Sequence, residues 1–180
     1  MHEIVLPDNF KPALEWVNNR ILQKVSPTPR HAHAQFRFAS ALGSWTEAKN
    51  CGFVGPEVRF QVQPPGEIAR TLVPDVAYIS FERASSEELE HASAVSAAPD
   101  VVVEIRSPDD RQADIEDKVR VYLSAGTRVV FLVDPVKKSV VAVDAHDVRD
   151  LSRGKITHEA LPGFELEAEA LFEFPRARRR

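Results

Sequence analysis

One carboxylate stands inside an otherwise apolar run of β-branched residues, and this feature constrains the fold more than any other. The run is Val101-Val102-Val103-Glu104-Ile105. Its composition predicts a strand that is buried on both faces. A carboxylate there costs free energy unless a cation or a hydrogen-bond network receives it. A second acid, Asp75, lies in a similar segment from Leu72 to Ile79. The fold therefore has to compensate the charge of two acids on core strands.

The spacing of apolar residues predicts two helices around these segments. Phe38, Leu42 and Trp45 recur at intervals of three and four, which predicts a helix from His31 to about Lys49. A second helix is expected to start within residues 107–110 and to end near residue 125, where Gly126 suits a C-terminal cap.

Alternating or continuous apolar runs predict the strands. They are expected at residues 57–63, 72–80, 100–107, 128–134 and 139–145, with the last one at the sheet edge, and as two short strands around Asn18-Asn19. Residues 81–98 are expected to form a surface excursion, and the end of the chain a loop with a short closing helix. This order predicts a mixed α/β (α+β) domain in which helices flank a mixed β-sheet.

Length and composition bound the class of protein. A chain of 180 residues suits one domain, so residues 1–174 are expected to form it and residues 175–180 a basic tail. No apolar stretch approaches the roughly 20 residues that cross a membrane, and no secretory signal is visible. The single cysteine excludes an internal disulfide and a cysteine-based zinc site, so a cytoplasmic location is expected. A net charge of -4 argues mildly against a protein that coats nucleic acid, but it allows a local basic patch.

Asp75 and Glu104 can form a metal site if their strands pair. Opposite residues on paired strands lie about 5 Å apart between Cβ atoms. Two carboxylates that close repel each other, and a bound Mg²⁺ removes the repulsion. Asp100 competes with Asp75 for this role, but it lies roughly 13 Å along the same strand from Glu104 and cannot share an ion with it. Asp75 is therefore the expected partner of Glu104.

Lys118 is the candidate cation near the two acids. On a helical wheel it falls at the edge of the apolar stripe that contains Ile115, Val119 and Tyr122. Its stem can run along the core while its ammonium reaches the strand ends. Taken alone, a lysine in this position is more often a surface residue whose stem covers apolar neighbours.

Taken together, these residues resemble a known family. Pro74-Asp75, then Glu104 in Val-Glu-Ile-Arg-Ser-Pro, then Asp114, Lys118 and Tyr122, then residues 129–135 are similar to the Uma-type endonucleases of the PD-(D/E)XK superfamily. Val25-Ser26-Pro27-Thr28-Pro29 with His31 and His33, and Leu161-Pro162-Gly163-Phe164, extend the resemblance to roughly residues 10–174.

The resemblance implies a restriction-endonuclease-like core and a metal-dependent DNA endonuclease. It implies that Asp75 and Glu104 hold Mg²⁺ or Mn²⁺ and that Lys118 orients the attacking water or stabilises the phosphorane. The superfamily's usual lysine, two residues after the second acid, is replaced by Arg106. A further acid from the N-terminal half often completes such sites, and Glu57 and Glu47 are the candidates.

Other interpretations remain open at this point. The negative net charge favours a catalytically inactive nuclease fold that binds nucleic acid or a protein, and RNA or branched DNA is a third option. A homodimer is plausible because cutting two strands commonly uses two sites. His31 and His33 are expected to be helix-start or surface residues, and the C-terminal arginines a solvated tail.

Overall fold

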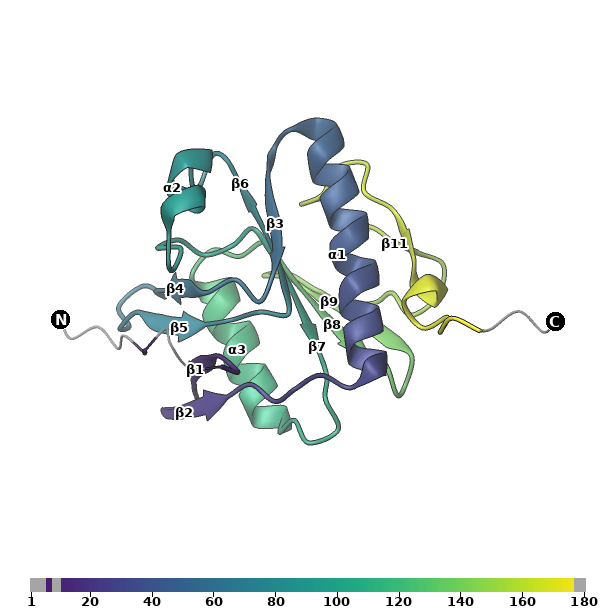
Figure 1. Cartoon of the computed structure of the whole chain (residues 1–180), viewed down its shortest axis with the longest axis horizontal. Helices are drawn as coiled ribbons and strands as arrows, with labels where there is room; N and C mark the ends of the chain where they lie inside the picture. The colour runs from purple at the N-terminus through teal and green to yellow at the C-terminus, as the bar shows by residue number, and fades with distance from the viewer. Residues whose placement is uncertain (1–5, 8–10, 177–180) are drawn as a thin grey trace.

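The computed structural model describes residues 6–7 and 11–176 (Figure 1). Its helices are α1 (Pro29–Lys49), α2 (Ser86–His91), α3 (Gln112–Ser124) and the 3₁₀ helix η1 (Ala168–Leu171). Its strands are β1 (Leu14–Val17), β2 (Arg20–Gln23), β3 (Gly52–Pro56), β4 (Phe60–Val62), β5 (Arg70–Leu72), β6 (Val76–Ser80), β7 (Val101–Ile105), β8 (Val129–Asp134), β9 (Ser139–Val143), β10 (Val148–Asp150), β11 (Lys155–Ile156) and β12 (Leu166–Glu167).

Six strands form the central sheet, in the order β10-β9-β8-β7-β6-β3. β7 and β8 pair in parallel, and the other neighbours pair antiparallel. α3 is the crossover that joins the two parallel strands, as such a pair requires. Because β7 and β8 are parallel, their carboxyl ends meet at one edge of the sheet.

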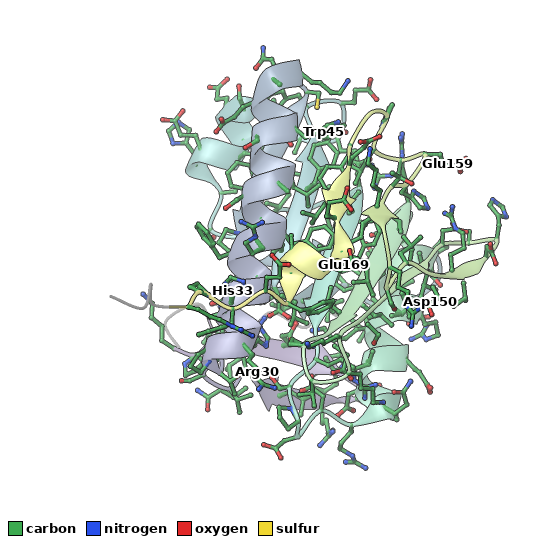
Figure 2. The ribbon with its side chains drawn as sticks, turned by 90° about the vertical axis from the view of Figure 1, so that its right-hand side faces the viewer. Arg30, His33, Trp45, Asp150, Glu159 and Glu169 are labelled. Carbon is green, nitrogen blue, oxygen red and sulfur yellow. The ribbon has the colours of Figure 1, made fainter. Side chains whose placement is uncertain are left out.

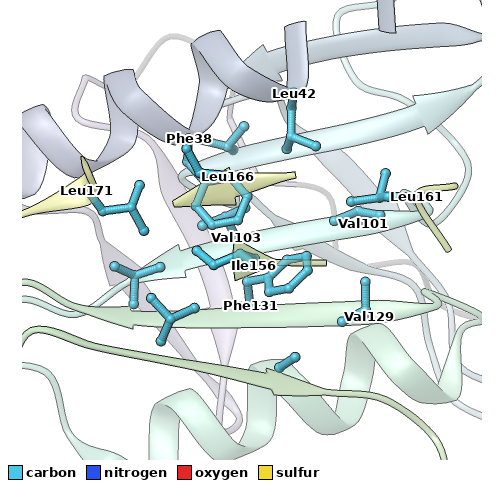
Figure 3. Packing of buried hydrophobic residues seen from close by; sticks show 14 of the residues in the cluster. Phe38, Leu42, Val101, Val103, Val129, Phe131, Ile156, Leu161, Leu166 and Leu171 are labelled. Carbon is cyan, nitrogen blue, oxygen red and sulfur yellow. The ribbon is translucent and has the colours of Figure 1, made fainter. Parts of the chain in front are cut away.

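α1 and the C-terminal segment cover one face of the sheet (Figures 1 and 3). Val101, Val103 and Ile105 of β7 point to this face and pack in one cluster with Phe38 and Leu42 of α1. Successive side chains of a strand point to opposite faces, which sends Val102 and Glu104 to the other side. The alternation of β7 therefore decides which helix meets the carboxylate.

α3 covers the second face, together with the hairpin β1–β2 and the small sheet β4–β5. Val121 and Tyr122 of α3 pack there against Val102 of β7 and Val130 of β8. The helix that carries Lys118 thus lies on the face to which Glu104 points.

The start of α1 is set by its cap. Thr28 adopts an extended backbone and its side chain accepts a hydrogen bond from the His31 backbone N–H, with Pro29 at the start of the helix. This cap fixes the first turn of a long helix, and the first turn carries His31 toward the sheet.

The prediction of a mixed sheet flanked by helices is confirmed, but both outer strands of the central sheet, β3 and β10, were not expected, and the expected strands differ in three details. The expected strand 72–80 is two strands, because Pro74 cannot donate to a ladder and separates β5 from β6. The expected strand 57–63 is the shorter β4, which pairs with β5 outside the central sheet. β9 is not the edge strand, because β10 pairs outside it.

Among the helices within the described ranges, none is long and apolar enough to cross a membrane.

Candidate active site

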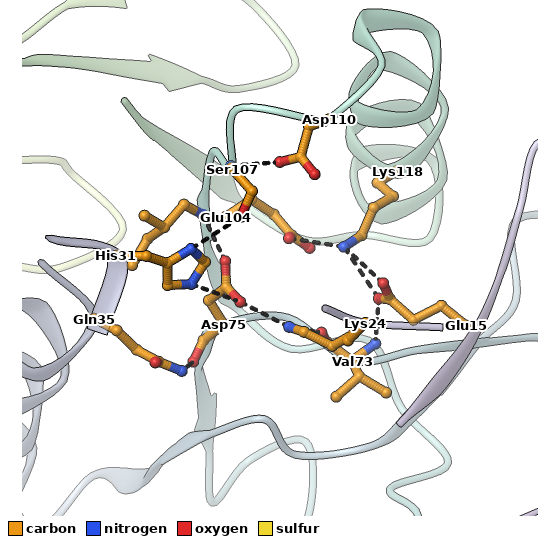
Figure 4. Close-up of polar contacts among 11 residues, drawn as sticks. Glu15, Lys24, His31, Gln35, Val73, Asp75, Glu104, Ser107, Asp110 and Lys118 are labelled. Carbon is orange, nitrogen blue, oxygen red and sulfur yellow. Dashed lines mark hydrogen bonds and ion pairs between the residues drawn. The ribbon is translucent and has the colours of Figure 1, made fainter. Parts of the chain in front are cut away.

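A cavity of about 320 Å³ opens at the edge where β7 ends, and Asp75, Glu104 and Lys118 all line it. Figure 4 shows these three side chains converging on one another. Asp75 directly precedes β6, Glu104 lies on β7 and Lys118 lies on α3. The three residues expected from the sequence to form the site therefore lie together. The cavity also receives Glu15, Lys24 and His31, for which no catalytic role was expected.

The pairing of β6 with β7 sets the positions of the two acids. Val76 pairs with Val103, so one further step of this antiparallel register sets Asp75 opposite Glu104. Asp75 Oδ2 accepts a hydrogen bond of 2.7 Å from the backbone N–H of Ile105, the residue after Glu104. The acid is thus tied to the neighbouring strand at the point where the ladder ends.

Lys118 lies between two carboxylates. Its ammonium is 2.7 Å from Glu104 Oε2 and 3.0 Å from Glu15 Oε1. Only about 12% of its side chain is exposed. The Lys118 side chain thus points toward the strand ends, as predicted. It is not a surface lysine, because its ammonium lies inside the cavity.

The hairpin β1–β2 supplies Glu15 and Lys24, which sequence reasoning missed. Glu15 Oε1 accepts a hydrogen bond of 2.8 Å from the Val73 backbone N–H, and the Lys24 ammonium donates to the Val73 carbonyl at 2.9 Å. Lys24 also pairs with Asp75 Oδ1 at 2.7 Å. The hairpin is therefore fastened to the segment that leads into Asp75. One feature of the sequence could have indicated a role for the hairpin: Glu15 is an acid between the apolar residues Leu14 and Trp16 in a predicted short strand.

His31 lies in the first turn of α1, as expected of a helix-start residue, but it is buried in the site and does not lie on the surface. Its Nε2 lies 3.4 Å from Asp75 Oδ1, and its Nδ1 lies 3.4 Å from the Ser107 hydroxyl. The N-terminal cap turns the imidazole inward. His33 points elsewhere and packs its ring against Phe174, with 5.4 Å between ring centroids.

The two candidates for a third acid are not the acid found nearest the centre. Glu47 lies exposed near the end of α1 and does not line the cavity. Glu57 lines the rim, but its side chain is exposed and only its backbone N–H contacts the Pro74 and Asp75 carbonyls. Glu15 takes the central place instead. Asp100 lies outside the cavity, as expected, and contacts Ser80, Arg83 and Arg128 at the other end of β7.

The pKa values of the two acids, Glu104 and Asp75, shift in opposite directions. Burial raises the pKa of Glu104 to about 7, against the pull of Lys118. Burial also acts on Asp75, but Lys24 and His31 outweigh it and hold the pKa of Asp75 well below its ordinary value. The two lysines resist the effect of burial, since Glu104 and Glu15 raise the pKa of Lys118 and Asp75 raises that of Lys24. Glu104 is therefore the acid that exchanges a proton near neutral pH.

The residues present fit a divalent cation. Seven acidic and five basic side chains line the cavity, so its charge favours a cation. Glu104 Oε1 is buried and makes no hydrogen bond of ordinary geometry among the described residues. The buried Tyr122 hydroxyl is its polar neighbour, and burial together with the Glu104 carboxylate raises the pKa of Tyr122. Within those residues, no three histidine, cysteine or acidic side chains are grouped closely enough to hold an ion by themselves. Mg²⁺ tolerates this, because it commonly binds one or two carboxylates and keeps several waters.

Comparison with known proteins agrees with this geometry. Residues 3–169 match the family Uma2, described as "Putative restriction endonuclease". Among curated proteins, none matches the chain. The fold is similar to the crystal structure of a "putative nuclease belonging to DUF820" from Anabaena variabilis, with a TM-score of 0.80, 25% sequence identity and 93% of each chain covered. The family match spans nearly the whole chain, and the expected restriction-endonuclease-like fold is confirmed. The chain therefore belongs to the Uma2 family of nuclease-like proteins.

Proposed function

We propose that this protein is a metal-dependent endonuclease that hydrolyses phosphodiester bonds in DNA. Asp75 and Glu104 are the proposed ligands of Mg²⁺ or Mn²⁺, and Lys118 is the proposed catalytic lysine. The observation that carries the proposal is Glu104 Oε1, which is buried in an acidic cavity beside an ammonium and makes no hydrogen bond of ordinary geometry among the described residues. Membership of a family of nuclease-like proteins supports the type of reaction.

Each residue in the cluster has a task that follows from its contacts. When bound, a divalent ion would polarise the phosphate and acidify a water molecule. The Lys118 ammonium has three N–H donors and directs them at the carboxylates of Glu15 and Glu104. If one of these hydrogen bonds breaks, the freed N–H can donate to a phosphate oxygen of the substrate. His31 and Lys24 keep Asp75 ionised.

Two further cations at the cavity rim suit an incoming nucleic acid. Arg106 and Arg111 line the cavity and make no ion pair within the part of the chain that the structure describes. Guanidinium groups bind phosphate through parallel N–H donors. Arg106 stands where the superfamily's usual lysine would be, and it can hardly act as a base at neutral pH. Binding of the substrate backbone is therefore the role proposed for both arginines.

A second candidate function is a nuclease fold that binds nucleic acid without cutting it. Lys24 favours this alternative, because its ammonium already occupies Asp75 Oδ1, where a metal ion would bind. The net charge of -4 also disfavours a tight hold on a polyanion. Lys118 is a catalytic residue in the endonuclease and has no catalytic role in the binding protein. Substitution of Lys118 therefore distinguishes the two functions.

The test is Mn²⁺-dependent nicking of supercoiled DNA and cleavage of single-stranded DNA by the wild type and by Lys118→Ala. The proposal expects cleavage by the wild type and a loss on the order of 10²-fold or more in the variant, as for removal of an electrostatic stabiliser. Lys49→Ala, an exposed lysine outside the cavity, is the matched control and should cut like the wild type. A wild type that cuts neither substrate would favour the binding protein.

Folding has to be followed in the same variants. Lys118→Ala leaves Glu15 and Glu104 buried without their shared cation, and such a change is destabilising. Lys118→Arg keeps a cation between the two acids, but its planar group cannot replace a compact ammonium. We expect Lys118→Arg to fold and still to cut at least about tenfold more slowly than the wild type. Equal cutting by folded Lys118→Arg and wild type would reject the role proposed for Lys118.

A further inference from the structure

A second cavity, of about 720 Å³, lies beside the first turn of α1. Arg30 and His33 line it from the helix, Lys138 from the turn after β8, and Arg176 from the C-terminal segment. Figure 2 shows Arg30 and His33 near one end of α1, whereas Trp45 lies toward the other end. The cavity thus joins segments that are distant in the sequence.

The charge of this cavity is opposite to that of the first one. Its only acidic lining residue is Glu173, against Arg30, Lys138 and Arg176. Over the described residues, these three cations form no ion pair or side-chain hydrogen bond, although most basic residues around the first cavity are paired. Exposed cations left unpaired in a hollow, in a chain with a net charge of -4, form a local site for an anion.

His33 adds a ring nitrogen that lacks a partner among the described residues. Its Nε2 is buried and has no hydrogen-bond partner among the described residues. The ring is held by Phe174, so its orientation is fixed by packing and not by a polar contact. The positive end of the α1 helix dipole also lies at this end of the helix. These features favour phosphate over an uncharged ligand.

The two cavities are neighbours at the same edge of the sheet. The Arg106 backbone N–H donates to the Val133 carbonyl, so the chain that lines the first cavity adjoins the end of β8, just before Pro135 of the second. Paired strands lie about 4.8 Å apart. On α1, His31 lines the first cavity and the adjacent Arg30 lines the second. A nucleic-acid strand that enters the first cavity can therefore continue into the second.

We infer that the cavity of Arg30, His33, Lys138 and Arg176 is a phosphate subsite, which binds the nucleic-acid backbone next to the phosphodiester that is cut. This inference rests on the proposed function. The acidic first cavity repels a polyanion, and a neighbouring basic cavity supplies the attraction that it lacks. The ligand is the sugar-phosphate backbone, recognised by charge and not by base sequence.

The test is binding of a fluorescent 12-nucleotide oligo(dT) strand, followed by anisotropy in EDTA at several NaCl concentrations. Arg30→Gln/Lys138→Gln removes two of the proposed phosphate contacts. Each lost contact on a single strand should lower the slope of log K against log salt by about 0.7, so the double variant should lose about 1.4. Its affinity at 50 mM salt should fall by roughly tenfold or more.

The matched control is Lys49→Gln/Arg153→Gln. It removes the same charge from two exposed residues that line neither cavity. Lys49 ends α1, whereas Arg30 lies in its first turn, so the two residues are about 30 Å apart along the helix. The inference requires that this control bind like the wild type. Equal losses in both double variants, an unchanged slope in Arg30→Gln/Lys138→Gln, or no binding by the wild type would overturn it.

Two further arms separate this inference from its alternatives. Polyglutamate that displaces the strand at equal charge concentration would identify a site for acidic peptides, and would overturn the assignment to nucleic acid. Mn²⁺-dependent hydrolysis of the small phosphodiester bis(4-nitrophenyl) phosphate by the wild type tests the proposed function separately. Binding of the oligonucleotide without hydrolysis would reject the proposed endonuclease function and leave the phosphate subsite standing. Hydrolysis without binding would reject the phosphate subsite and leave the endonuclease function standing.

Discussion

The two ends of β7 each hold a buried carboxylate, but the two acids have opposite surroundings. At the start of the strand, Asp100 accepts a hydrogen bond of 2.8 Å from the Ser80 backbone N–H and pairs with Arg83 at 3.0 Å and Arg128 at 3.5 Å. At the end of the strand, Glu104 meets Lys118 through one oxygen, and its other oxygen makes no hydrogen bond of ordinary geometry among the described residues. Glu104 lines the first cavity, whereas Asp100 lines neither of the two cavities described above.

The comparison of Asp100 with Glu104 shows how a buried acid that only stabilises the fold can be distinguished from one that belongs to a functional site. Both acids are less than a tenth exposed, so burial does not distinguish them. Asp100 is satisfied by a backbone donor and two guanidinium groups that stay charged, which leaves it nothing further to bind. Glu104 keeps an unfilled oxygen and a raised pKa in an open cavity. An unmet bonding capacity next to open space is therefore the better indicator of a site.

The largest expected effect separates the two acids by activity. Glu104→Gln should lower Mn²⁺-dependent DNA cleavage by on the order of 10²- to 10³-fold, or about 3–4 kcal/mol, because it removes a proposed metal ligand. Asp100→Asn should lower cleavage only in proportion to the folded fraction. Initial rates on supercoiled DNA, normalised to folded protein by circular dichroism, measure both. Similar losses per folded molecule would remove the distinction between the two ends of β7.

The next effect separates the same acids by stability. Asp100→Ala should lower the free energy of unfolding by about 3 kcal/mol, since it leaves the Ser80 N–H unsatisfied and two arginines unpaired. The loss stays below that of a fully buried pair, because the Arg83 and Arg128 side chains are 27% and 56% exposed and are partly screened by solvent. Glu104→Gln should cost less, or stabilise the metal-free protein, because the acid is desolvated. Urea denaturation of both variants measures this, and the reverse order would contradict the account.

The pH dependence of stability gives a smaller effect of known sign. The pKa of Glu104 is raised from 4.5 to about 7, so between these values the folded protein holds a proton that the unfolded chain has released. The free energy of unfolding should therefore fall as the pH rises from about 5 to about 7, by roughly 2 kcal/mol. Asp75, whose pKa is lowered, titrates below this window. Urea denaturation at pH 5.5 and 7.5 should show the fall in the wild type and not in Glu104→Gln, and a parallel response of the two proteins would count against a desolvated Glu104.

The smallest expected effect concerns Lys24, the cation that pairs with Asp75 beside the Glu104 end of β7. Its ammonium competes with a metal ion for Asp75 Oδ1, so Lys24→Met should tighten Mn²⁺ binding by about tenfold, or about 1.4 kcal/mol. Lys155→Met, which removes an exposed lysine paired with Glu165, is the control and should leave the affinity unchanged. Calorimetric titration decides the matter. Weaker binding in Lys24→Met would mean that Lys24 organises the site and does not compete for it.

The sequence pattern predicted the parts of the site that belong to regular elements of the sheet and its crossover. Glu104 lies on β7 and Asp75 directly precedes β6, both within visible apolar runs, and the helical period of α3 directed Lys118 to the strand ends. These predictions need only local spacing and one strand pairing. Pro74 also carried the information that the strand before Asp75 is broken, although the continuous apolar run concealed it.

The remaining residues depend on contacts that no local pattern contains. Glu15 and Lys118 are separated by 103 residues, and the hairpin that carries Glu15 reaches the site only because it packs across α3 and β5. The inward direction of His31 depends on the cap at Thr28, whereas helical spacing alone does not distinguish His31 from His33. Tertiary packing therefore decided the second half of the cluster.

The central claim is that the Glu104 end of β7 binds a divalent cation and the Asp100 end does not. Diffraction from crystals of the wild type soaked in Mn²⁺, with an anomalous difference map, tests it most directly. The account predicts one peak at about 2.1 Å from carboxylate oxygens of Glu104 and Asp75, with the Lys24 ammonium displaced from Asp75. Lys24 still paired with Asp75 and no peak beside Glu104, or a peak at Asp100, would contradict it.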